Sequence, residues 1–165
     1  MNDLFQEILV KRKTPAADQL KKAGLILVTV LFGAAGLLLT PLGLLPAVIM
    51  AGVCMFLFPR FDLEYEYLYV NGDIDIDKIM GKVKRKQCAS YSIADLEIGA
   101  PTGSHSLDQY SSQSMKTRDF TSLTGGPSYT LIYNKEGSRE RVLMELDGAI
   151  LDDMRRHAPR KILRD

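Results

Sequence analysis

The polar segment between residues 99 and 110 contains side chains of the types that hydrolases use. Ser104 carries a hydroxyl nucleophile, His105 a base, and Asp108 an acid that could orient the base. In known hydrolases such groups meet through the fold, and a nucleophile elbow or an oxyanion loop accompanies them. The sequence around Ser104 has neither feature. We therefore expect a polar loop in which His105 is solvated or stabilises a turn, with hydrolysis as the weaker alternative.

Two stretches are candidate binding surfaces. Loops carry binding residues more often than cores do, so the first candidate is Gly103, Ser104 and His105. A basic run is the second, because positive charge attracts anionic lipid headgroups. Its residues are Lys84, Arg85 and Lys86, with Lys82 just before them.

Three aspartates, Asp73, Asp75 and Asp77, alternate along one expected strand. Carboxylate oxygens suit Ca²⁺ or Mg²⁺, but a calcium site needs a curved backbone that brings its ligands together. A strand instead spaces alternate side chains about 7 Å apart. We therefore interpret the aspartates as a solvated acidic face opposite the lysines of the next strand, and we predict no metal site.

Motifs for other chemistries are missing from the sequence. It contains no phosphate-binding loop, dinucleotide fingerprint, metalloprotease motif or redox cysteine pair, so we predict no cofactor, no catalytic residue and no enzymatic activity. The two cysteines, Cys54 and Cys88, fall in an apolar block and a polar region, which makes them poor disulfide partners. A net charge of +1 provides no global basic field, so nucleic acid is not an expected partner.

A long apolar block determines the organisation of the chain. No charged residue occurs from Gly24 to Phe58, which is more than the roughly 20 residues that one membrane-spanning helix needs. Pro41 and Gly43 interrupt the block and favour a sharp turn over residues 40–46. We predict helices over residues 20–39 and 44–58, which form a transmembrane hairpin within residues 20–59.

Two alternatives exist for this block. The first run could be a signal peptide cleaved near Ala34-Ala35-Gly36, but the apolar run continues beyond that point. The block could also be a buried hairpin of a soluble protein, but a chain of 165 residues could hardly cover it. A membrane hairpin is the preferred interpretation, with the lipid bilayer as the first expected partner.

Lysine and arginine flank only one end of the hairpin. Arg60 follows the second helix and the turn has no basic residue. The basic residues before the first helix are Lys11, Arg12, Lys13, Lys21 and Lys22. Because such residues favour the cytoplasmic side, we expect a multi-pass protein of the cell membrane with both termini in the cytoplasm.

Residues 1–19 form an amphipathic N-terminal segment. Leu4, Phe5, Ile8 and Leu9 fall on one helical face, so a short helix is expected over residues 3–12. Such a helix would lie on the inner leaflet or pack on the soluble domain, and the sequence favours neither.

From residue 60 onward the apolar residues alternate with polar ones. Tyr65, Tyr67 and Tyr69 alternate with acidic residues, and Asn71-Gly72 is a strong hairpin signal. About seven short strands are expected by this pattern, the third and fourth over residues 82–89 and 92–98, a later one over 118–123 and the last over 142–146. Residues 99–116 form an irregular polar connection. Asp147 can cap a final helix that extends through His157.

This order of elements predicts an α+β chain. A two-helix transmembrane hairpin precedes a soluble domain over residues 60–165, in which an antiparallel β-sandwich or barrel is capped by a C-terminal helix. Such a meander closed by one helix matches the pleckstrin-homology (PH) architecture.

Several short motifs resemble one protein family. They are Glu64-Tyr65-Glu66-Tyr67, Asn71-Gly72, Ile74-Asp75-Ile76-Asp77-Lys78-Ile79, Lys84-Arg85-Lys86 and Gly103-Ser104-His105. Over nearly the whole chain the sequence resembles an uncharacterised family of small two-helix membrane proteins of Gram-positive bacteria with a bacterial PH-like domain. The resemblance implies architecture and no catalytic motif.

Together these features predict a membrane-anchored module that faces the cytoplasm and binds another membrane or cytoplasmic protein. The first alternative is a module that responds to anionic lipid at the membrane surface. The Asn71-Gly72-Asp73 loop departs from the basic loop by which PH domains bind phosphoinositides, so no specific headgroup is implied.

Overall fold

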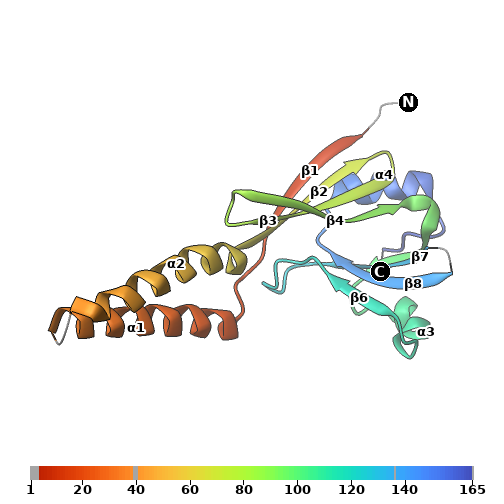
Figure 1. The fold of residues 1–165 in the computed structure, drawn as a ribbon. Helices are drawn as coiled ribbons and strands as arrows, with labels where there is room; N and C mark the ends of the chain where they lie inside the picture. The colour runs from red at the N-terminus through yellow and green to blue at the C-terminus, as the bar shows by residue number, and fades with distance from the viewer. Residues whose placement is uncertain (1–3, 39–40, 136, 165) are drawn as a thin grey trace. The chain divides into compact units, whose positions relative to one another are not determined.

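The computed structural model describes residues 4–38, 41–135 and 137–164 of the chain, and Figure 1 shows its elements. The chain divides into two compact units. The first contains Met1–Arg12, Glu64–Lys78 and Lys86–Asp165, and the second contains Lys13–Leu63 and Ile79–Arg85. The second unit therefore combines the apolar block with a short segment that is distant in the sequence.

Two helices joined by a 3₁₀ turn form most of the second unit. Their bounds are Ala16–Leu38 for α1, Pro41–Gly43 for the turn and Leu44–Phe61 for α2. Thr40, which belongs to the expected turn, lies outside the described residues. Helix α1 begins earlier than expected, because the Pro15 carbonyl already accepts hydrogen bonds from the Asp18 and Gln19 amides at 3.0 Å. The predicted pair of apolar helices with a tight turn is confirmed.

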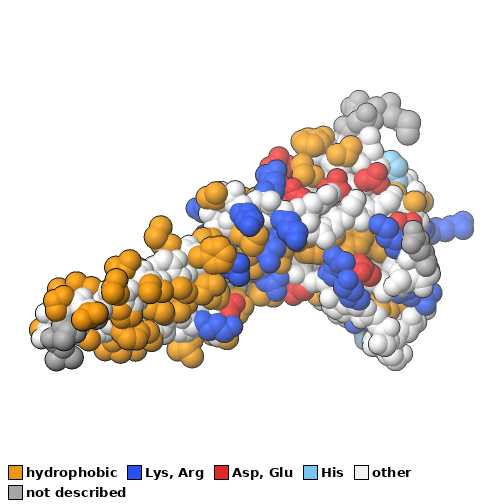
Figure 2. Space-filling model, in the orientation of Figure 1, with side chains coloured by type: hydrophobic (Ala, Val, Ile, Leu, Met, Phe, Trp, Pro, Cys, Tyr) orange, Lys and Arg blue, Asp and Glu red, His pale blue; other side chains and the backbone are white. Residues whose placement is uncertain are grey.

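Most apolar side chains of these helices face outward, as the hydrophobic surface in Figure 2 shows. Among their described residues only Gly36 and Cys54 are buried, whereas Leu37 and Met55 are each 80% exposed. The helices meet where the Thr29 hydroxyl lies 3.6 Å from the Cys54 sulfur. Both helices are long and apolar enough to cross a membrane.

The first unit contains two four-stranded sheets and a C-terminal helix. One sheet has the order β1-β2-β3-β4, with bounds Phe5–Lys11, Leu63–Val70, Asp73–Met80 and Lys84–Ser92. The other has the order β5-β7-β8-β6, with bounds Leu96–Pro101 (β5), Lys116–Asp119 (β6), Tyr129–Lys135 (β7) and Ser138–Met144 (β8). Helix α4 covers Gly148–His157. The described strands therefore number eight rather than about seven, and they form two separate sheets rather than a closed barrel.

The eighth strand is β1, so the helix predicted over residues 3–12 is wrong. Strand β1 pairs antiparallel with β2, from Phe5 opposite Val70 to Lys11 opposite Glu64. Its exposure alternates with a period of two, and Val10 is buried. Because apolar residues four apart also fit a helix, the short sequence matches both periods, and pairing with β2 decides between them.

The hairpin at Asn71-Gly72 is confirmed. Both residues have positive φ, 49° and 98°, as the tight turn between β2 and β3 requires. The expectation of purely antiparallel sheets is not met, because β6 pairs parallel with β8. Residues 120–137, which include β7, connect the two parallel strands and let the chain return before β8 begins.

A single hydrophobic core lies between the sheets and α4. Helix α4 buries Ile150, Leu151 and Met154, and β2 buries its three tyrosines. The core includes Tyr65, Tyr67, Tyr69, Ile74, Ile76, Leu131, Tyr133, Val142, Met144, Ile150 and Met154. Glu64 and Glu66, which alternate with these tyrosines along β2, are also buried.

Candidate functional site

The expected polar connection contains two short helical elements. A 3₁₀ turn, His105–Leu107, leads into the four-residue helix α3, Asp108–Ser111. The Ser104 hydroxyl accepts the Ser106 amide at 3.2 Å and caps the turn. The fully exposed His105 places its Nδ1 3.3 Å from an Asp108 carboxylate oxygen. These three side chains thus stabilise the local turn rather than converge on one point.

A cavity of about 390 Å³ lies beside this loop and over the second sheet. Gly103 and Ser104 line it, while the exposed His105 does not. Its apolar wall comes from Leu107, Ile132 and Leu143. Its polar rim includes Thr102 and Thr130, whose hydroxyls lie 3.1 Å apart, and Arg141, which donates to the Tyr110 carbonyl at 2.7 Å. The cavity is suited to an apolar side chain that enters between hydroxyl groups.

The second predicted surface lies on β4. Lys84, Arg85 and Lys86 are all exposed there. Lys84 and Arg85 belong to the second unit, at the start of the strand, while Lys86 belongs to the first. The six predicted binding residues therefore form two surfaces on different elements rather than one site.

The structure adds a contact that the sequence analysis missed. The β3–β4 turn is held against the end of α2, where the Gly81 amide donates to the Asp62 carbonyl at 2.9 Å. A Cβ on Gly81 would lie 2.5 Å from the Cβ and 2.9 Å from the Cα of Pro59. No sequence signal links this turn to a proline some twenty residues earlier.

Backbone conformation fixes this turn further. Gly81 and Lys82 both have positive φ, 57° and 59°, and the Val83 amide donates to the Met80 carbonyl at 3.3 Å. Two consecutive residues of positive φ are typical of a type I′ turn, in which glycine or asparagine usually occupies both positions. Lys82 therefore holds a conformation that its side chain disfavours.

The second unit is also strongly basic. It has seven lysines and arginines, namely Lys13, Lys21, Lys22, Arg60, Lys82, Lys84 and Arg85. Its only acidic residues are Asp18 and Asp62, so its formal charge is +5, while the first unit has fourteen basic and eighteen acidic residues and a charge of −4. The near-neutral charge of the whole chain therefore conceals a clear separation of charge.

Aromatic rings and cations also meet at the end of α2. The Lys22 ammonium lies 5.6 Å from the centre of the Phe61 ring, and the Arg60 guanidinium 4.6 Å from that of Phe56. The Thr14 hydroxyl donates to the Phe61 carbonyl at 3.2 Å. These contacts place the start of α1 beside the end of α2.

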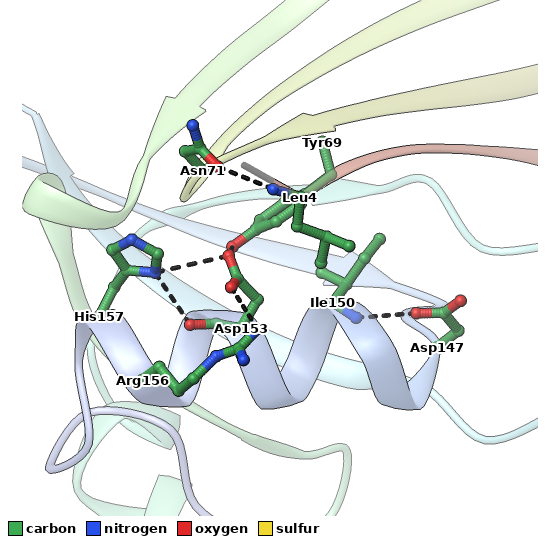
Figure 3. Close-up of polar contacts among 8 residues, drawn as sticks. All are labelled: Leu4, Tyr69, Asn71, Asp147, Ile150, Asp153, Arg156 and His157. Atoms are coloured by element: carbon green, nitrogen blue, oxygen red, sulfur yellow. Dashed lines mark hydrogen bonds and ion pairs between the residues drawn. The ribbon is translucent and has the colours of Figure 1, made fainter. Parts of the chain in front are cut away.

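A polar cluster joins α4 to the first sheet (Figure 3). The Tyr69 hydroxyl donates to a carboxylate oxygen of the buried Asp153 at 2.7 Å, and Arg156 donates to the other at 2.6 Å. Burial raises the pKa of Asp153, but the hydrogen bonds from Tyr69 and Arg156 and the nearby His157 outweigh it and lower this pKa below its ordinary value. Burial and the Asp153 carboxylate raise the pKa of Tyr69. This cluster fixes the helix on the sheet.

A second polar cluster borders a cavity of about 310 Å³ beside Cys88. Glu140 accepts the Tyr91 hydroxyl at 3.0 Å, and Arg118 lies 3.3 Å from the same carboxylate while it donates to the Cys88 carbonyl. Burial raises the pKa of Glu140, but the Tyr91 hydrogen bond and the charges of Arg118 and Lys116 lower it below its ordinary value. Because Glu140 pairs with Tyr91, Arg118 and Lys116 within the cluster, we assign the cluster a structural role.

The expected acidic face lies along β3, where Asp73 is exposed and Asp75 and Asp77 are half-buried. Along β3, Asp75 accepts a hydrogen bond from Gln87 at 3.5 Å. Within residues 4–38, 41–135 and 137–164, no group of three or more His, Cys, Asp or Glu side chains is placed to hold a metal ion.

Two packed sheets with a C-terminal helix define a PH-like protein. The comparison with protein families agrees, because the model of the family described as Bacterial PH-like domain (DUF6106) matches residues 2–164. The chain belongs to this family, whose molecular function is unknown. Comparison with curated proteins and with solved structures gave no match.

Proposed function

We propose that the protein is a two-pass membrane protein whose PH-like unit binds a partner protein at the cytoplasmic face. One observation carries the proposal: an apolar helical hairpin with outward-facing side chains is inserted between two paired strands, β1 and β2. The resemblance to small membrane proteins of Gram-positive bacteria points the same way.

The exposed apolar surface supports the membrane part of the proposal. Soluble monomers rarely expose a contiguous apolar patch larger than a few hundred Å², and each exposed Å² costs about 25 cal/mol in water. Outward side chains on both helices include Leu20, Leu27, Val30, Leu31, Leu37, Leu38, Leu45, Val48, Ile49, Met55 and Phe56. With a rise of 1.5 Å per residue, the 18 residues of α2 extend about 27 Å, close to the hydrocarbon thickness of about 30 Å.

Strand pairing supports an even number of membrane crossings. Lys11, which precedes the hairpin, lies opposite Glu64, which follows it. Two strands of one sheet must be on the same side of a membrane, so the hairpin enters and leaves on that side. The seven basic residues of the second unit support the cytoplasm as that side, because positive charge near membrane helices favours it.

Cysteine labelling tests the orientation. With Cys54 and Cys88 replaced by alanine, we expect Leu42→Cys in the turn to react with an impermeant maleimide on intact cells. His105→Cys should react only after the cells are permeabilised. Labelling of both sites on intact cells, or of neither, would contradict the proposed topology.

The cavity beside residues 102–111 is the surface we propose for the partner protein. Its apolar wall and hydroxyl rim can accept an apolar side chain, and the fully exposed His105 directly follows Ser104, which lines it. A photo-crosslinking amino acid at position 105 should capture one defined membrane or cytoplasmic protein. The same amino acid at the exposed Arg155 on α4 is the control. Identical products at both positions, or a product that Leu107→Asp does not reduce, would count against this surface.

A further inference from the structure

An apolar side chain projects between two lysines at the β3–β4 turn. Val83 is 91% exposed, and Lys82 and Lys84 are exposed on either side of it. Among the described residues, neither lysine forms an ion pair. An exposed valine between unpaired lysines is poorly suited to water but well suited to a membrane interface, where an apolar side chain and cations are both accommodated.

The turn does not move independently of α2. The Gly81 hydrogen bond to Asp62 and the close approach of Gly81 to Pro59 fix it beside the last turn of that helix. Val83 is only two residues beyond Gly81, so these contacts also fix its position along the axis of α2. The turn and the helix belong to one compact unit.

The length of the hairpin places Val83 and the last turn of α2 at the membrane surface. The charge-free part of α1, from Ala23 to Leu38, is 16 residues long and extends about 24 Å, less than a hydrocarbon core of about 30 Å. A short span draws the headgroups towards the residues at its ends. Lys22 beside Phe61 and Arg60 beside Phe56 are the cation and aromatic groups typical of that boundary.

Charge selects the kind of lipid. The unit that contains the turn has a formal charge of +5, and three of its cations, Lys82, Lys84 and Arg85, lie within four consecutive residues. The cytoplasmic leaflet is rich in anionic phospholipid, which attracts basic residues near its surface. The negative first unit does not offer the same attraction.

We infer that the β3–β4 turn binds anionic phospholipid headgroups of the bilayer that its own hairpin spans. Val83 inserts at the boundary with the acyl chains, while Lys82, Lys84 and Arg85 contact phosphate groups around it. This inference rests on the proposed membrane anchor. It makes the turn a third contact of the chain with the membrane, beside the two helices, and one that depends on lipid charge.

Fluorescence of the full chain in lipid nanodiscs tests the inference. Cys54 and Cys88 are replaced by alanine, Val83→Cys carries an environment-sensitive dye, and the discs contain phosphatidylcholine with or without phosphatidylglycerol. We expect a blue-shifted emission and protection from an aqueous quencher only with phosphatidylglycerol, reversed by high salt. The same dye at His105→Cys should report the same quenching in both lipids.

Charge variants provide a second test of the inference. Each basic residue near an anionic surface raises the binding constant about fivefold. Gln at positions 82, 84 and 85 should therefore lower the ratio of membrane-bound to unbound turn about a hundredfold. Gln at Lys135, Arg155 and Arg160 removes as many exposed charges from the first unit and should leave protection intact. Protection that is equal in both lipids, absent in both, or insensitive to the first triple variant would overturn the inference.

Extraction with alkaline carbonate distinguishes failure of the membrane anchor from failure of the lipid contact at the turn. If alkaline carbonate extracts the chain from vesicles, the hairpin does not span the bilayer, and the inference falls together with the proposed function. If the chain resists extraction while the dye at position 83 stays fully quenched in phosphatidylglycerol, the anchor stands and only the inference falls.

Discussion

Gly81 approaches Pro59 so closely that a β-carbon on the glycine would overlap the proline ring. Glycine is required there for a second reason, because its φ of 57° is disfavoured for residues with a side chain. Proline at the last turn of α2 and glycine in the β3–β4 turn are therefore complementary in shape. This pair connects two segments that the sequence pattern treats as independent.

Substitution of this glycine should release the turn from α2. In the full chain in nanodiscs, Gly81→Ala should raise the hydrogen-exchange rate of the amide at position 81, because that amide loses the Asp62 carbonyl. Gly125→Ala is the matched control, since Gly125 also has positive φ, 80°, but has no atom within 4 Å of an added Cβ. It should cost only the conformational penalty of about 1 kcal/mol and leave exchange at Gly81 unchanged. Equal protection of the amide at position 81 in both variants would show that the contact with Pro59 does not determine its exchange rate.

Lys82 offers a change that should stabilise the protein. Its φ of 59° is strained for a lysine, so Lys82→Gly should raise the free energy of unfolding by about 0.5–1 kcal/mol. Lys84→Gly, at a strand position two residues later, should lower it by a similar amount of roughly 0.5–1 kcal/mol. Thermal unfolding of the full chain in mild detergent measures both, and a shift of the same sign in the two variants would contradict the proposed strain.

Two buried tyrosines should respond differently to loss of the hydroxyl. Tyr69→Phe removes the donor to the buried Asp153 and should destabilise the protein by about 1–3 kcal/mol, because the carboxylate keeps its burial but loses a hydrogen bond. Tyr133→Phe should be neutral or slightly stabilising, since its hydroxyl is buried without a hydrogen-bond partner among the described residues. Urea unfolding of the two variants compares one chemical change in two environments. Equal losses would show that the Tyr69–Asp153 bond contributes little.

Stability should fall in acid through two carboxylates. The pKa values of Asp153 and Glu140 are lowered in the folded protein, so the unfolded chain binds protons first as the pH falls. The stability they contribute is complete above their unfolded pKa values of about 4, and it is lost as the pH falls from there through the folded values. Asp153→Asn and Glu140→Gln should each flatten the acid limb of a plot of unfolding free energy against pH.

The effects of these two variants should add, because the carboxylates lie in separate clusters. An acid limb that is equally steep in the double variant and in the unmodified protein would assign acid sensitivity to other groups.

Strand β1 predicts how a soluble version must be made. If a short flexible turn replaces residues 13–62, β1 can still pair with β2, and we expect a folded, monomeric PH-like unit. A fragment of residues 61–165 lacks β1 and leaves the edge of β2 open, so it should aggregate. Size-exclusion chromatography with tyrosine near-ultraviolet circular dichroism compares the two. A monomeric, folded 61–165 fragment would show that β1 is dispensable.

The sequence predicted elements whose signals are local. The apolar helices, the Asn71-Gly72 turn and the cap of α4 by Asp147, which accepts the Ile150 amide at 2.9 Å, each depend on neighbouring residues. Features that depend on distant residues were missed or misassigned. Strand β1 was predicted as a helix because seven residues fit both periods, and the contact of Gly81 with Pro59 leaves no trace in either segment alone.

The candidate site also combines features that the sequence predicted with features that depend on distant residues. Residue type identified Ser104 and Lys84 as candidate binding positions, which the structure places at a cavity and at a strand end. It could not show that Ile132 and Leu143, from two strands of the second sheet, form the apolar wall of that cavity. Nor could it show that a basic turn and the two apolar helices form one unit, because that depends on packing between segments.

The position of the hairpin between β1 and β2 also sets the order of events during synthesis. Strand β1 leaves the ribosome first, but its partner β2 is complete only at Val70. At about 5–20 residues per second, the ribosome needs roughly 3–12 seconds to make the intervening chain. Both apolar helices are therefore synthesised before the first sheet can close. The first strand of the nascent chain therefore has no pairing partner until the whole apolar hairpin has been synthesised.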